Sequence, residues 1–311
     1  MRIDPDRLSP AVAYGMLTAT MACLALNHVI GRGMHELAPP VGLSFWRWTV
    51  AAVLMLAIVG RGLGTKLPVY RRHSLLFLGL GALMVGSTTL LVWSLQFTQA
   101  MNVSLINGLQ PAMTVLMTFV FLQQRLTLLQ IAGVVVGFVG VLAMVSKGSW
   151  QVVASLSFNR GDIGALIGMF GLAAYAIGLR WLPRGLRPFD ALFGITVAGC
   201  LALLPIYAAE SLSGRPFALT PETAGAVLAM GTIGSVAGNL MWNIGNQALG
   251  ANKASIFVNL IPVFGVVMAI AFLGETLRPY HVVGFGLICA GVWCVLARRM
   301  MNADTARVRE T

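Results

Sequence analysis

Asparagine side chains recur at helical spacing inside an apolar stretch of this chain. Asn239, Asn243 and Asn246 fall on one face of an expected helix, and Trp242 lies beside them. Polar side chains within an apolar span are costly unless they face a cavity or another helix. An interhelical hydrogen bond, worth about 0.6–2 kcal/mol, would account for any one of them. Three on one face favour a pocket, and we expect Asn239, Asn243 and Trp242 to bind a substrate there.

A second polar stripe runs along residues 100–122. Asn107, Pro111, Thr114 and Thr118 are spaced so that they share one helical face. Trp93, in the preceding apolar stretch, belongs to a similar stripe. We expect Asn107 and Trp93 to line the same central pocket, with interhelical hydrogen bonding as the alternative for each.

Arg47 and His28 are ionisable side chains that lie well within the apolar stretches. Arg47 is flanked by aromatic residues in Phe45–Trp48, and it could either anchor a substrate carboxylate or extend towards the outer surface. His28 could handle a proton or form a structural hydrogen bond. We expect both side chains to lie near one outer entrance, and we count both as candidate substrate-binding residues.

The sequence holds no arrangement typical of a catalytic or metal centre. It contains no HExxH or GxSxG motif, and no acidic pair within the expected spans. Glu210 and Glu275 lie at the outer ends of two spans, where water can solvate them. The four cysteines have no metal-ligand spacing and are expected to be buried free thiols. We therefore expect no catalytic residue, no metal and no cofactor.

The composition is that of a membrane protein, since 58% of residues are hydrophobic, 10% are charged and the mean hydropathy is +0.83. Apolar runs of about 20 residues, long enough to cross a bilayer core of roughly 30 Å, recur along the chain. We expect ten membrane-spanning helices, at residues 11–31, 40–60, 74–97, 100–122, 127–146, 161–182, 188–209, 222–247, 251–273 and 278–298. The first is expected to be retained, because no small-residue cleavage site follows it.

The net charge of +11 follows the expected topology. With the N-terminus inside, fifteen Lys and Arg residues fall on the inner side and five on the outer side, which is the positive-inside pattern. This predicts a multi-pass inner-membrane protein with both termini in the cytoplasm. The basic charge then needs no nucleic-acid partner. We expect the partners to be a small-molecule substrate and the lipid bilayer, and we expect the protein to function as a monomer.

The sequence of residues 100–142 recurs in similar form at residues 251–293, at a fixed offset of 151, with twelve identities in forty-three positions. Composition this biased would give roughly three or four identities by chance. The match predicts two five-span repeats, residues 1–150 and residues 151–311, the second with a short cytoplasmic tail. Because each repeat has an odd number of spans, the two must be inverted relative to each other, as in carriers that work by alternating access.

Pro111 and Pro262 occupy matching positions near the centres of the repeated spans. A mid-helix proline lacks an N–H and clashes with the carbonyl four residues earlier, here that of Asn107 or Val258. Such carbonyls need a protein partner or a water-filled cavity. The pair predicts two hinges near the membrane midplane, with a simple packing kink as the alternative.

The second repeat carries a recognisable set of residues, namely Pro262, Phe272–Leu277, Gly284 and Gly291. The first repeat carries Asn27, Gly31, Arg32, Phe45–Arg47, Pro111 and Phe121. Together, over residues 11–298, these resemble EamA-type members of the drug/metabolite transporter superfamily. Gln123 and Gln124 depart from that pattern, which has Gly-Glu at this point. The first copy of the acid at the helix end is therefore missing.

The resemblance implies an all-α bundle of ten transmembrane helices with a central cavity flanked by the two repeats. It also implies a carrier, and we expect an exporter of small amphiphilic metabolites such as amino acids. An importer and a drug-efflux carrier of the same fold are the alternatives. Short loops argue against a membrane scaffold, and the lack of catalytic motifs argues against a membrane enzyme.

Overall fold

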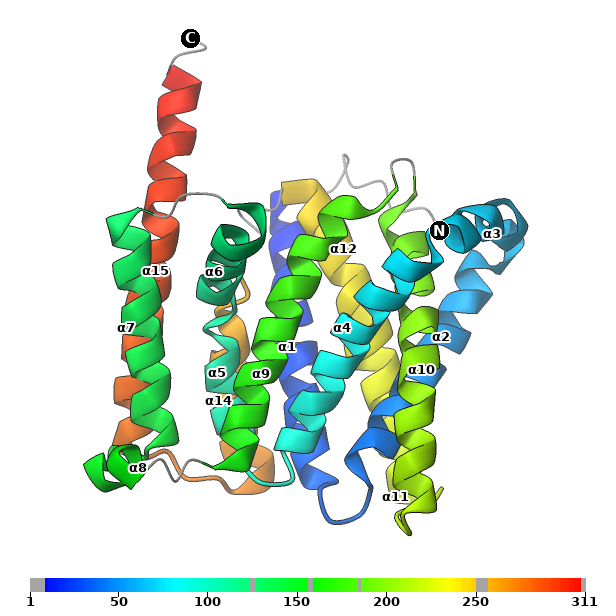
Figure 1. Cartoon of the computed structure of the whole chain (residues 1–311), viewed down its shortest axis with the longest axis horizontal. Helices are drawn as coiled ribbons and strands as arrows, with labels where there is room; N and C mark the ends of the chain where they lie inside the picture. The colour runs from blue at the N-terminus through cyan, green and yellow to red at the C-terminus, as the bar shows by residue number, and fades with distance from the viewer. Residues whose placement is uncertain (1–8, 124–126, 156–158, 184–185, 250–256, 309–311) are drawn as a thin grey trace.

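In the computed structural model, the chain forms a bundle of helices that stand roughly side by side (Figure 1). The structure describes residues 9–123, 127–155, 159–183, 186–249 and 257–308. Over these ranges the chain forms helices, turns and irregular segments and no strand. The expected all-helical fold is confirmed for this part of the chain.

The helices follow the apolar stretches of the sequence. Up to residue 145 they are α1 (Pro10–Gly33), α2 (Pro40–Val59), η2 (Gly60–Gly62), α3 (Leu63–Arg72), α4 (Ser74–Ser94), α5 (Ala100–Asn107), α6 (Gln110–Leu122) and α7 (Leu128–Val145). After it they are α8 (Trp150–Ser155), α9 (Arg160–Gly178), η3 (Leu179–Trp181), α10 (Pro188–Leu212), α11 (Pro221–Ala229), η4 (Met230–Gly238), α12 (Asn239–Leu249), α14 (Leu260–Leu273) and α15 (Pro279–Val308). Of the η elements, η4 is a π-helix and the other two are 3-10 turns.

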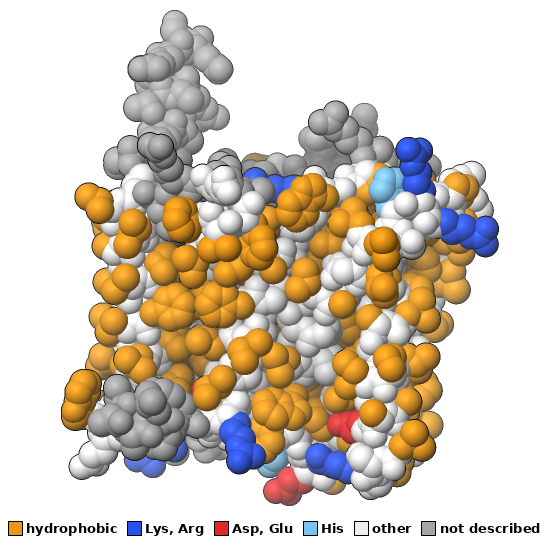
Figure 2. All heavy atoms as spheres, viewed as in Figure 1, with side chains coloured by type: hydrophobic (Ala, Val, Ile, Leu, Met, Phe, Trp, Pro, Cys, Tyr) orange, Lys and Arg blue, Asp and Glu red, His pale blue; other side chains and the backbone are white. Residues whose placement is uncertain are grey.

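Seven of the described helical segments are long and apolar enough to cross a membrane, and the bent pair α5–α6 makes eight. Two shorter apolar segments follow them, namely α14 (Leu260–Leu273) and the first part of α15 (Pro279–Cys294). Apolar side chains cover the middle of the face in Figure 2, whereas the Lys and Arg side chains visible there lie near the two ends of the bundle. This is the surface of a protein that crosses a membrane several times.

The fourth expected span is broken, not merely kinked. Helices α5 and α6 meet at 49° across a turn at Gly108 and Leu109. Pro111 therefore lies in the first turn of α6, where its missing N–H removes no intrahelical hydrogen bond. The related stretch behaves alike, since residues 258–259 form a turn before α14 begins at Leu260. A Cβ at Gly108 would lie 3.1 Å from Cγ of Pro262, so the two breaks touch.

The π-helix η4 brings α1 and α2 together. A Cβ at Gly231 would lie 3.0 Å from the carbonyl oxygen of Arg47 on α2. A Cβ at Gly234 would collide with the side-chain amide of Asn27 on α1. Small residues let helices approach this closely in a membrane, and π segments occur frequently at functional sites.

Glu210 and Glu275, expected to be solvated, instead cap helices of the other half of the chain. Glu210, near the end of α10, accepts hydrogen bonds from the backbone N–H groups of Val41 (3.3 Å) and Gly42 (2.8 Å) at the start of α2. Glu275 accepts them from Ala100 (2.8 Å) and Met101 (3.0 Å) at the start of α5. A helix N-terminus has unpaired N–H groups and a positive dipole end, so a carboxylate stabilises it.

Helices α7 and α15 pack directly on each other through glycines. A Cβ at Gly140 would lie 2.6 Å from the carbonyl oxygen of Gly284, and a Cβ at Gly284 would lie 2.7 Å from that of Gly140. At the other end of the contact, a Cβ at Gly291 would collide with the carbonyl oxygen of Gly133. Any side chain at these positions would push the two backbones apart.

Candidate substrate site

Arg47 lies inside the bundle without a partner for most of its guanidinium. The residue is only 3% exposed, so it does not extend to an aqueous surface. Its Nε and Nη2 atoms are buried and bond to nothing in the part of the chain that the structure describes. Its guanidinium carbon lies 4.9 Å from the ring centre of Trp48, a cation–π distance. A buried cation without an anionic partner is costly, which makes this position a candidate anion site.

His28 connects α1 to the broken span. Its Nδ1 shares a hydrogen bond of 3.0 Å with Oγ of Ser104 on α5, and both residues are buried. Ser104 in turn packs against Gly265 of α14. Arg47 and His28 are both buried inside the bundle, and their expected grouping at one entrance stays a prediction.

Three buried oxygen atoms near these elements also have no hydrogen-bond partner within the described ranges. They are Oγ of Ser44, Oδ1 of Asn107 and Oγ of Ser235. Ser44 lies one turn before Arg47 on α2, and Ser235 follows the glycine that packs on Asn27. Buried polar atoms are nearly always bonded in folded proteins, so unpaired ones point to a ligand or water.

The asparagine stripe expected at residues 239–246 lies on α12, and its described members have different surroundings. Asn239 donates a hydrogen bond of 2.7 Å to the carbonyl of Ser235 in the same helical segment. Trp242 packs in an apolar cluster with residues of α1 and α14, including Met21, Ala25 and Ile261. The side chain of Asn243 lies outside the described residues.

Trp93 lies at a different helix interface. A Cβ at Gly164 of α9 would lie 2.9 Å from Cζ3 of the Trp93 ring, and the ring centre of Phe97 is 4.8 Å away. These contacts place Trp93 between α4 and α9. The contacts do not join it to Arg47, although both were expected to bind substrate.

Sequence reasoning missed a second buried polar cluster. Asp162, at the start of α9 and 1% exposed, accepts hydrogen bonds from Oγ1 of Thr98 (2.6 Å) and Nδ2 of Asn102 (3.2 Å). Nδ1 of His281 accepts the backbone N–H of Arg278, which leaves Nε2 to donate to Oδ1 of Asn102 at 3.0 Å. The available signal was the position of Asp162 at the start of the expected span 161–182, because an acid there can lie in the first buried turn of the helix.

The arrangement is suited to binding rather than to bond cleavage. A guanidinium with free donors can hold a carboxylate or phosphate through two parallel hydrogen bonds. No group of three or more His, Cys, Asp or Glu side chains able to hold a metal ion occurs among the residues that the structure describes. We group Arg47, His28, Ser44, Asn107 and Ser235 as the Arg47 site, because they lie on α1, α2, α5 and η4, and η4 packs on α2 and α1 while α1 packs on α5.

Comparison with known proteins agrees with this chemistry. Residues 11–146 and 159–297 each match the EamA-like transporter family. The Uncharacterized transporter YyaM of Bacillus subtilis is 30% identical over 258 residues, which are 81% of this chain and 83% of that protein. The Probable terminal-alkyne amino-acid exporter of Streptantibioticus cattleyicolor is 29% identical over 261 residues, 83% of this chain and 84% of that protein.

A solved crystal structure has the same fold. It matches with a TM-score of 0.58 at 18% sequence identity, over 93% of this chain and 98% of that chain. The family expected from the sequence motifs is confirmed by these comparisons. The chain is a multi-pass membrane transporter, and it belongs to the EamA-like transporter family.

Proposed function

We propose that this transporter exports small amphiphilic metabolites that carry a carboxylate, such as amino acids. The observation that carries the proposal is the buried, unpaired guanidinium of Arg47. Within the described ranges no acidic side chain forms a salt bridge with it, so a carboxylate of the substrate is the natural partner. One relative, 29% identical, is named as a probable amino-acid exporter.

The rest of the Arg47 site suits the other end of such a molecule. Asn107 and Ser235 offer unpaired oxygen atoms that can accept hydrogen bonds from an ammonium group. Trp242, on the helical segment that continues from Ser235, provides apolar surface together with its cluster. We assign Asn239 and Asn243 to the lining of the path, together with Trp93 on its α9 side, while His28 positions Ser104 and α5.

Transport requires that the site open to each side in turn. We assign ten spans in two inverted five-span repeats, with Pro111 and Pro262 marking the hinges. Support comes from the glycine contacts between α7 and α15. Exchanging the two repeats converts the Gly140–Gly284 contact into the Gly291–Gly133 contact, as a two-fold axis in the membrane plane would produce. The contact of Gly108 with Pro262 couples the two breaks.

The proposed orientation follows from the Lys and Arg distribution. Both termini lie in the cytoplasm, and the protein is a monomer of the inner membrane. Export then carries substrate from the end of the bundle that holds α3 to the end that holds Glu275 and Glu210.

Flux from loaded vesicles tests the proposal. Vesicles containing the purified protein are loaded with a panel of labelled amino acids, and saturable release is measured. The Asn239→Leu and Asn243→Leu variants should fold normally and lose flux if these side chains line the path. Unchanged flux in both would make them interhelical contacts only, and no saturable flux for any amino acid would refute the proposed substrate class.

A further inference from the structure

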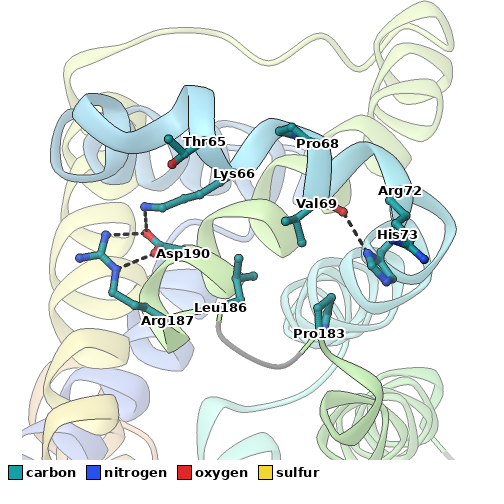
Figure 3. A pocket seen from close by; sticks show the side chains of 10 residues that line it. All are labelled: Thr65, Lys66, Pro68, Val69, Arg72, His73, Pro183, Leu186, Arg187 and Asp190. Carbon is teal, nitrogen blue, oxygen red and sulfur yellow. Dashed lines mark hydrogen bonds and ion pairs between the residues drawn. The ribbon is translucent and has the colours of Figure 1, made fainter.

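A pocket lies at the end of the bundle that holds α3, and none of its lining residues belongs to the Arg47 site. It has a volume of about 600 Å³ and opens between α3, the segment before α10 and the start of α10. Figure 3 shows the side chains that line it, with Lys66, Asp190 and Arg187 on one side and Arg72 and His73 on the other.

One side of the pocket is a preformed ion-pair cluster. Nζ of Lys66 lies 2.6 Å from Oδ1 of Asp190, and Nε of Arg187 lies 2.7 Å from its Oδ2. Nη2 of Arg187 donates to Oδ1 at 3.1 Å. Asp190 is 1% exposed, so its charge is fully engaged in orienting these two cations.

The other side carries Arg72, a cation without such a partner, and the ring of His73. In the described part of the chain, neither Arg72 nor His73 forms an ion pair with a carboxylate. His73 donates from Nδ1 to the carbonyl oxygen of Val69 at 3.1 Å, which fixes its ring in the pocket wall. The lining thus holds three permanent cations, Lys66, Arg72 and Arg187, against the single carboxylate of Asp190. The excess of positive charge selects an anion.

Apart from Thr65, the remaining lining is apolar, through Pro68, Val69, Pro183 and Leu186. The flanking sequence is apolar and exposed as well. Leu75, two residues after His73, is 83% exposed, and Trp181, two residues before Pro183, is 57% exposed. A cationic pocket beside exposed aliphatic and Trp side chains matches a molecule with an anionic head and an acyl chain.

Helix α3 depends on this region for its attachment to the bundle. No residue of α3 is fully buried. The helix is held by the Lys66–Asp190 pair and by Tyr70, whose hydroxyl donates to the carbonyl oxygen of Asp190 at 2.9 Å. Burial and the charge of Asp190 together raise the pKa of Tyr70 to about 12, so the donor keeps its proton. A ligand in the pocket would add a second bridge between α3 and α10.

We propose that this pocket binds the anionic phosphodiester headgroup of an acidic phospholipid, with Arg72 as its principal ligand. The site is separate from the Arg47 site and does not depend on the identity of the exported substrate. Under the proposed topology it faces the cytoplasmic leaflet, where a phospholipid can enter from the side of the bundle.

Lipid binding can be measured directly on the whole protein. Purified protein is exchanged into nanodiscs of phosphatidylcholine with increasing phosphatidylglycerol, and co-purifying lipid is quantified by native mass spectrometry. Phosphatidylglycerol should be retained in preference to phosphatidylcholine. Arg72→Gln should weaken that preference about fivefold, the effect of removing one basic residue near a phosphate.

Arg71→Gln is the matched control, because Arg71 is the adjacent exposed residue of α3 and does not line the pocket. It should leave the preference within about twofold of that of the unmodified protein. Equal losses in the two variants, or no preference for phosphatidylglycerol in the unmodified protein, would overturn the proposal. A soluble sn-glycerol phosphate that displaces the lipid at equal concentration would also overturn it, by showing a site for free phosphate esters.

Discussion

Gly140 on α7 and Gly284 on α15 each lie where a Cβ would meet the backbone of the other, 2.6 Å and 2.7 Å from the facing carbonyl oxygens. Gly284 is the repeat equivalent of Gly133, and Gly291 is that of Gly140. Gly133 and Gly291 also touch. The contact therefore maps onto itself when the repeats are exchanged, as a two-fold relation between inverted halves requires.

Gly284→Ala should destabilise the protein by about 1–3 kcal/mol, because the new methyl group meets the backbone of α7 and cannot be accommodated by a rotamer change. Thermal unfolding in detergent measures this as a lower Tm. Gly286→Ala is the control on the same helix, since nothing lies within 4 Å of a Cβ there. Equal Tm values for the two variants would mean that α7 and α15 do not pack as described.

Gln123→Gly should stabilise the protein by about 0.5–1 kcal/mol. Gln123 ends α6 in the left-handed region at φ 50°, and its repeat equivalent Gly274 ends α14 at φ 64°. Glycine adopts this conformation without the strain that a side chain adds. Gly274→Ala should lower the Tm instead, and a rise in both variants would contradict the shared cap geometry.

Glu275→Gln should destabilise the chain by about 1 kcal/mol, because a neutral amide caps the N-terminus of α5 less well than a carboxylate. Chemical unfolding followed by circular dichroism provides the measurement. Glu36→Gln is a suitable control, since the Glu36 side chain is 83% exposed and caps no helix N-terminus in the described structure. An unchanged midpoint for Glu275→Gln would show that the two hydrogen bonds to Ala100 and Met101 add nothing.

The helices themselves could be predicted from the sequence, because burial in lipid demands long apolar runs that hydropathy detects directly. The paired prolines marked the correct places in the repeated spans. They did not predict the geometry, since a proline is compatible both with a kinked helix and with the first turn of a new one. The turn at Gly108 and Leu109 selects the second form.

Contacts between residues far apart along the chain could not be predicted from the sequence. Glu275 pairs with backbone groups 174 and 175 positions away, and no periodicity within one helix reports such a partner. The same applies to Asp162 with Asn102, and to Trp93, whose ring lies against Gly164 of α9. Periodicity defines a face of a helix, whereas packing decides what that face meets.

Amino-acid counterflow in vesicles, comparing the unmodified protein with Arg47→Lys, tests whether Arg47 holds the carboxylate of the substrate. Lysine keeps the positive charge but loses the planar pair of donors that grips a carboxylate. We expect saturable flux in the unmodified protein and a KM about tenfold higher in Arg47→Lys, with Arg180→Lys, an exposed site, unchanged. Equal KM values for the two arginine variants would contradict the assignment of Arg47 as the carboxylate anchor.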